Sequence, residues 1–172
     1  MVEESGFVFT PPHEAWFRFA DCGTYRTRLS GQGIKEMDFA YWDAPRDRLA
    51  LLEIEDYTGR EMKDHRVERL IAKGKDVLVM LHSAWHEVPS ELGASLAREI
   101  PELLRVRSRV QIVFVLKLDG GTQRMAMSKM RDKIRRAIRA YAALLDMDGD
   151  AALMDQHQAL EFGLPLRPSG AV

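Results

Sequence analysis

Two acids two residues apart, Glu53 and Glu55, lie in an otherwise apolar stretch that indicates a strand over 48–57. Side chains two residues apart in a strand project from the same face. Both carboxylates therefore point one way, whereas Leu52 and Ile54 point the other way. Any fold of this chain has to give those two carboxylates a common environment.

A third acid, Asp38, interrupts the preceding apolar stretch, 34–42. If that stretch pairs with 48–57 as a hairpin, Asp38 reaches the face of Glu53 and Glu55, because neighbouring strands lie about 4.8 Å apart. Three carboxylates at such a distance repel one another unless a positive charge lies among them. A hard cation with oxygen ligands, Mg²⁺ or Mn²⁺, meets that need. The alternative is that the acids are solvated side chains on an exposed sheet face.

The composition bounds the class of protein. A chain of 172 residues, 46% of them hydrophobic, suits one domain with a sizeable core. The single cysteine, Cys22, excludes an internal disulfide, which fits a reducing cytoplasm. The acidic N-terminus does not resemble a secretory signal, and no apolar run approaches the roughly 20 residues that span a membrane. We expect a soluble cytoplasmic protein with no membrane contact.

Charge is distributed unevenly along the chain, although the net charge is only −1. Residues 124–139 carry seven basic side chains against one acid, or +6, whereas 140–172 carry five acids against one arginine, or −4. A local basic block of this kind is typical of phosphate binding, so it predicts contacts with nucleic acid. The alternative is a solvated helix face that pairs with the acidic segment 146–155. The candidate contact residues are Lys129, Lys133, Arg135, Arg136 and Arg139.

The hydrophobic pattern predicts a three-strand antiparallel meander near the start of the chain. Its strands are expected over 24–29, 34–42 and 48–57, with a hairpin loop at 43–47. Residues 13–19 suit either a short helix or a strand. The pattern divides the chain into an extended lead-in over 1–13, a core over 14–145 and an acidic C-terminal segment over 146–172.

After the meander the apolar period becomes helical. Helices are expected over 61–73, 90–104 and 122–145, and a strand buried on both faces over 110–116. Residues 76–83 suit either a second helix or a buried strand, and a short helix is expected over 151–160. The expected fold class is α+β or α/β: one domain, with the meander followed by a helix, a buried strand and a helix.

This order of elements, with acids on the second and third strands, resembles the core of the restriction-endonuclease-like superfamily, the PD-(D/E)xK nucleases. The resemblance covers roughly residues 14–145. It implies that Asp38 is the aspartate of the second strand, that Glu53 is the first acid of the third strand, and that Glu55 takes the position usually held by lysine. Asp38, Glu53 and the carbonyl of Ile54 would then hold one or two ions of Mg²⁺ or Mn²⁺.

Two positions depart from the pattern of that superfamily. Met37 stands where proline is frequent. Glu55 replaces the lysine that helps to orient or activate the attacking water, although some members carry a glutamate there. A lysine from a neighbouring element can serve instead. Lys63, at the start of the following helix, is the expected one, because Lys35 should face away from Asp38.

The function that the resemblance implies is metal-dependent hydrolysis of phosphodiester bonds in nucleic acid, DNA more than RNA. The protein would be a small endonuclease or exonuclease domain with Asp38, Glu53, Glu55 and Lys63 as catalytic residues. It would act as a homodimer or with a protein partner that supplies target specificity. One alternative is a catalytically inactive subunit of this fold that binds nucleic acid or a protein partner. Another is an unrelated α+β interaction module with its acids on the surface.

Overall fold

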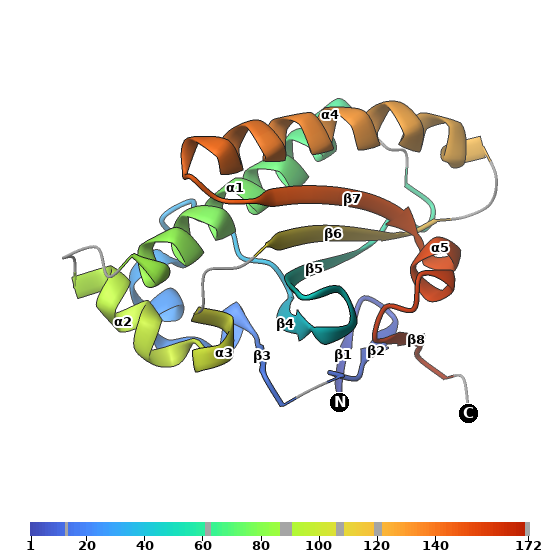
Figure 1. Cartoon of the computed structure of the whole chain (residues 1–172). Coiled ribbons are helices and arrows are strands. Elements are labelled where there is room, and N and C mark those ends of the chain that lie inside the picture. The colour runs from blue at the N-terminus through green and yellow to red at the C-terminus, as the bar shows by residue number, and fades with distance from the viewer. Residues whose placement is uncertain (13, 61–62, 87–90, 106–108, 119–121, 171–172) are drawn as a thin grey trace.

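The computed structural model describes residues 1–172 with the exception of 13, 61–62, 87–90, 106–108, 119–121 and 171–172. At its centre is a five-stranded sheet in the order β3-β4-β5-β6-β7. The strands are β3 (Trp16–Phe17), β4 (Phe39–Asp43), β5 (Arg48–Asp56), β6 (Val110–Lys117) and β7 (Gly149–Asp155). Helices α1 (Asp64–Trp85) and α4 (Thr122–Leu144) lie along one face of this sheet (Figure 1).

The central sheet is mixed. β3, β4 and β5 pair antiparallel, whereas β5, β6 and β7 pair parallel. The register of the β4–β5 hairpin places Phe39 opposite Leu52 and Asp43 opposite Arg48, and the 3-10 helix η3 (Ala44–Arg46) makes the turn. The predicted hairpin is therefore confirmed, although its first strand is shorter than the predicted 34–42. The class is a single α+β domain with a mixed sheet.

Glycine allows α1 to approach the sheet closely. A Cβ at Gly74 would lie 2.6 Å from Cδ1 of Ile138 in α4 and 3.3 Å from Cδ1 of Ile112 in β6. The buried residues of α1 recur at helical spacing around this point, as with Leu70 and Val77. Residues 61–62 of the predicted helix over 61–73 lie outside the described residues. The rest of it, from Asp64, and the undecided segment 76–83 belong to one continuous helix, because Gly74 is packed against its neighbours and does not end it.

The other face of the central sheet is covered by both ends of the chain. β1 (Val2–Glu4), β2 (Phe7–Phe9) and β8 (Leu166–Pro168) form a small antiparallel sheet in the order β1-β2-β8. Phe9 stacks on Phe39 of β4 with ring centroids 4.2 Å apart. The lead-in and the C-terminal segment thus share one apolar cluster with the core. None of the described helices combines the length and the apolar composition needed to cross a bilayer.

The prediction of a strand over 24–29 is wrong. Tyr25–Leu29 form the short π-helix η2, and the first strand of the meander is β3 in the segment that the pattern left open. The residue types of this segment favour a strand, but tertiary contacts override that preference. Tyr25 is buried, and its hydroxyl donates to the carbonyl of Ile34 at 3.1 Å and to Glu36.

Two predicted helices also differ. The segment 90–104, whose first residue lies outside the described residues, divides into α2 (Glu91–Glu99) and α3 (Glu102–Arg105) at Pro101, which cannot continue a helix. The first half of 151–160 is strand β7, and only α5 (Gln156–Glu161) is helical. Asp155 begins α5 with a reciprocal capping box to Gln158, which ends the strand sharply. Strand β6 and helix α4 agree with the prediction.

Candidate functional site

The three predicted acids lie on the face of the sheet that α1 covers. Because Phe39 is opposite Leu52, the same register places Asp38 opposite Glu53, and residues opposite each other share a face. Glu55 is two residues further along β5 and shares that face too. The acids are not solvated side chains: Glu53 is 2% exposed, and the side chain of Glu55 is 13% exposed.

Asp38, the residue directly before β4, forms a hydrogen bond with the backbone of β5. Its Oδ2 accepts a hydrogen bond from the N–H of Ile54, with a donor–acceptor distance of 2.7 Å. The N–H and the C=O of a strand residue point to the same neighbouring strand. The carbonyl of Ile54 therefore opens toward Asp38 as well, which places a carboxylate and a carbonyl oxygen on one edge of β5.

A lysine that the sequence analysis did not select lies among the acids. Nζ of Lys73 in α1 contacts Oε1 of Glu53 and lies 3.5 Å from Oε1 of Glu55. Arg69, one helical turn earlier, extends a nitrogen to within 3.6 Å of Oε1 of Glu55 from an exposed position. The ammonium group of Lys73 is thus the main positive charge inside the cluster, which we call the acid cluster: Asp38, Glu53, Glu55 and Lys73.

The electrostatics of the acid cluster show an excess of negative charge. Burial raises the pKa of Asp38 to about 6, against the opposing hydrogen bond from Ile54. Burial also raises the pKa of Glu53 well above its usual range, and the charge of Asp38 adds to this effect while Lys73 opposes it. Burial favours the neutral form of Lys73, but the charges of Glu53 and Glu55 outweigh burial and raise its pKa.

The chemistry of these donors fits a divalent cation. Oε2 of Glu53 and Oε1 of Glu55 are buried and accept no hydrogen bond within the described part of the chain. Three carboxylates against Lys73 and the exposed Arg69 leave an excess of negative charge, which a hard cation with oxygen ligands would offset. In the present arrangement, no three His, Cys, Asp or Glu side chains of the described residues converge as a ligand set.

The position of Lys73 differs from that of the predicted Lys63. Lys63 is the exposed N-cap residue of α1, about 15 Å from Lys73 along the helix axis at 1.5 Å per residue. One signal in the sequence could have identified Lys73. It lies three residues after Leu70 and four before Val77, so it belongs to the stripe of α1 that faces the sheet. A lysine on an apolar stripe needs an acidic partner beneath it.

The basic helix α4 uses part of its charge within the molecule. Arg135 and Arg139 each donate two hydrogen bonds of 2.8–2.9 Å to Asp150 of β7. Burial favours the protonated form of Asp150, but these two arginines hold the pKa of its carboxyl well below its usual range. Lys133 pairs with Glu68 of α1 at 2.5 Å. Pairing with the acidic segment, the alternative to nucleic-acid contact, thus applies to Arg135 and Arg139.

Other basic groups of α4 remain on the surface. Lys129 and Arg136 are exposed and form no ion pair with any described residue. Asp150 neutralises only one of its two arginines, so the face keeps a positive excess. Positive charge on one side of a helix attracts phosphates over several ångströms, even where single side chains are also paired.

Comparison of the chain with protein-family models, with curated proteins and with solved structures gives no match. A function for this protein therefore has to be argued from two of its own features. These are the acid cluster beneath α1 and the distribution of arginines around α4 and β7.

Proposed function

We propose that the protein is a metal-dependent nuclease domain that hydrolyses phosphodiester bonds in nucleic acid, DNA more than RNA. The observation that carries this proposal is the buried acid cluster, in which Lys73 contacts Glu53 and Glu55, and Asp38 binds the adjoining N–H of Ile54. A protein gains no stability from burying excess negative charge, so such clusters are typical of functional sites.

The arrangement of the elements supports the proposal. The acids lie just before β4 and within β5, and the strands β3, β4 and β5 are followed by the helices α1 to α3, by β6 and by α4. This is the order that the resemblance to the PD-(D/E)xK nucleases implies, with acids on the second and third strands. The strand assigned to the first position is β3 rather than 24–29, which does not move the acids.

Asp38, Glu53 and the carbonyl of Ile54 would hold Mg²⁺ or Mn²⁺. When bound, the cation lowers the pKa of a bound water and polarises the phosphate. Glu55 then accepts a proton from the attacking water. Lys73 takes the role that the resemblance assigns to lysine: its ammonium orients the water and donates to a phosphate oxygen. The exposed residues of α4, Lys129 and Arg136 among them, attract the backbone of the substrate.

Cleavage assays test this function. Single- and double-stranded DNA and RNA are incubated with Mg²⁺ or Mn²⁺ and the parent protein, Asp38→Asn, Glu53→Gln or Lys73→Met. We expect cation-dependent cleavage by the parent and a loss of at least about a hundredfold in each variant. Glu102→Gln, an exposed acid of α3, is the matched control and should cleave like the parent. Equal rates in the control and the three variants would refute the assignment.

One observation favours a second candidate, a catalytically inactive subunit that binds nucleic acid. Lys73 occupies the space among the carboxylates, and no converged ligand set is present in the described residues. Thermal unfolding with and without Mn²⁺ or Ca²⁺ separates the two, because an ion bound at the site stabilises the folded state. If the protein is a nuclease, the ions raise its unfolding temperature, and Asp38→Asn abolishes this increase. An inactive subunit binds DNA without any response to the ions.

A further inference from the structure

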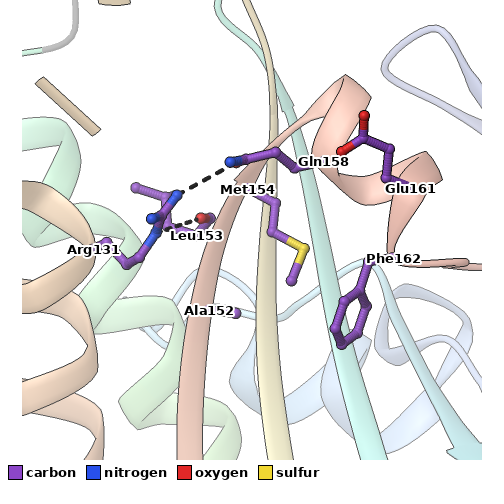
Figure 2. A pocket seen from close by; sticks show the side chains of 7 residues that line it. All are labelled: Arg131, Ala152, Leu153, Met154, Gln158, Glu161 and Phe162. Carbon is purple, nitrogen blue, oxygen red and sulfur yellow. Dashed lines mark hydrogen bonds between the residues drawn. The ribbon is translucent and has the colours of Figure 1, made fainter. Parts of the chain in front are cut away.

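Two adjoining cavities lie beside β7, on the face of the central sheet opposite the acid cluster. A cavity of about 190 Å³ is lined by Arg48, Gln111 and Asp150, among others. It adjoins a cavity of about 410 Å³, and the two share Arg131, Ala152, Met154 and Phe162. Figure 2 shows the larger cavity, with Arg131 and Phe162 on opposite sides of Met154. We call these two cavities together the β7 pocket.

The β7 pocket is separate from the acid cluster. Arg48 shares its face of β5 with Leu52 and Ile54, whereas Glu53 points to the face beneath α1. Arg48 and Glu53 are five residues apart in one strand, so their Cα atoms lie about 16 Å from each other at 3.3 Å per residue. A ligand in the pocket cannot be a ligand of the acid cluster.

Positive charge predominates in the β7 pocket. Arg48, Arg131 and Arg135 line the smaller cavity against Asp150, which leaves +2. The excess stays at +2 when the neighbouring Arg46, Arg139, Asp43 and Glu161 are included, since they add two charges of each sign. A phosphomonoester carries a charge of about −1.5 to −2 near neutral pH.

The arginines of the pocket are held in fixed orientations. Arg48 donates from Nε to Oδ2 of Asp43 at 3.1 Å and from Nη1 to Oε1 of Gln111 at 2.9 Å. Arg131 donates from Nε to the backbone carbonyl of Leu153 at 3.1 Å (Figure 2). A guanidinium has five N–H donors, so each of these side chains keeps donors for a ligand. Pre-oriented arginines lose little side-chain entropy when they bind a phosphate.

The remaining wall of the pocket is apolar and partly aromatic. Phe162 is 38% exposed, and Cζ of Arg46 lies over its ring, 4.3 Å from the ring centroid. Met154 lies beside it, and the small side chain of Ala152 leaves space over the strand. Aromatic and thioether groups favour a flat ring as their partner.

We propose that the β7 pocket binds an aromatic phosphomonoester, the chemical class of a mononucleotide. Its dianionic phosphate lies between Arg48 and Arg131, and its ring packs against Met154 and Phe162. The larger cavity, about 410 Å³ and open to solvent, falls within the range of about 300–1,000 Å³ for pockets that bind small organic ligands. The site does not depend on the nuclease proposal, since it shares no residue with the acid cluster.

Calorimetric titration tests the site with adenosine 5′-monophosphate, inorganic phosphate and adenosine as separate probes. We expect one binding site for the monophosphate, with weaker binding of each fragment and an affinity that falls with added salt. Arg48→Gln removes a phosphate contact, and Ala152→Leu fills the space for the ring. Each should weaken binding by about tenfold or more. Arg26→Gln, with the same change of charge at an exposed position in η2, should bind like the parent.

Three outcomes would overturn the proposal: no binding of the monophosphate, binding of free phosphate with equal affinity, or unchanged affinity in Ala152→Leu. Thermal unfolding of each variant verifies that it is folded. If Arg48→Gln does not fold, Ala152→Leu decides the result alone, because it changes no charge and sits at a half-exposed strand position.

Discussion

A carboxylate as deeply buried as that of Glu53 destabilises a folded protein unless positive charge accompanies it. Lys73 provides one such charge, from the helix above the strand. Glu55 lies near both Lys73 and the exposed Arg69, and Asp38 forms no ion pair with either, so negative charge remains in excess. The folded state therefore binds protons or cations at this site more tightly than the unfolded chain does.

The stability of the protein should depend on the ionisation of Asp38. Its pKa is about 6 in the folded state against 3.8 for the free side chain. A raised carboxyl pKa means that the contribution of Asp38 to stability is full below about pH 4 and is lost as the pH rises through 6. Asp38→Asn should therefore raise the free energy of unfolding at pH 7.5, without divalent ions, by on the order of 2 kcal/mol.

Urea denaturation of the parent and of Asp38→Asn between pH 4 and pH 8 measures this difference. The asparagine keeps an oxygen to accept the N–H of Ile54, so the hydrogen bond at the edge of β5 is retained. The advantage of the variant should disappear toward pH 4. A difference that does not change with pH would contradict the assigned pKa.

Removal of Lys73 should have the opposite sign. Lys73→Met leaves Glu53 buried without its partner, which costs about 3–5 kcal/mol for a broken buried pair. Glu53→Gln in the same protein removes the stranded charge, so the double variant should recover most of the loss. The free energies of unfolding of the two single variants and the double variant give the coupling. Simple addition of the two single effects would show that the pair is not coupled.

Two glycines allow a close approach between elements: Gly74 between α1 and its neighbours α4 and β6, and Gly149 between β7 and α4. At Gly149, the first residue of β7, a Cβ would lie 2.6 Å from Cβ of Ala142 in α4. Neither atom can move without its backbone. Gly149→Ala should thus separate α4 from β7 and destabilise the protein by about 1–3 kcal/mol.

A second substitution isolates this contact. Ala142→Gly removes the opposing Cβ at a cost of about 1 kcal/mol in helix propensity. Combined with Gly149→Ala it should relieve the clash, so the double variant is more stable than the sum of the single effects predicts. Ala143→Gly, at the neighbouring exposed position, has the same propensity cost and should give no relief. Equal results for Ala142→Gly and Ala143→Gly would contradict the packing argument.

The elements that sequence alone predicted well are those with one dominant period. β6 is apolar apart from Gln111 and Lys117, and α4 repeats its apolar residues every three or four positions. The predicted helix over 151–160 is wrong for the part that lies in β7, because Ala151, Ala152, Leu153 and Met154 favour helices and pairing with β6 makes them extended. The acids were predictable from their spacing, whereas the partner of Glu53 depended on how α1 packs over β5, which brings Lys73 of the predicted helix onto the acids.

At the scale of the whole molecule, both ends of the chain contribute to the apolar cluster on the face of the central sheet opposite α1. Phe9 of β2 is fully buried and contacts Phe39 and Tyr41 of β4 with centroid distances of 4.2 and 5.7 Å. Phe9→Ala should destabilise the whole domain by about 3–5 kcal/mol, because the cavity would lie between the two sheets. Val8→Ala, on the other face of the same strand, should cost less than about 1 kcal/mol. Thermal unfolding measures the stability of both variants. A similar loss of stability in Phe9→Ala and Val8→Ala would contradict a core shared by the two sheets.

The way in which α4 covers β7 has a consequence for assembly. Exposed edge strands are where separate molecules join their sheets. At β7, Arg131 donates a hydrogen bond to the carbonyl of Leu153, and the N–H of Ala151 donates one to the side chain of Asp150. The strand at the opposite edge, β3, is only two residues long. A second molecule that extended this sheet would first have to break those contacts. Extension of the central sheet by strand addition is therefore disfavoured at both of its edges.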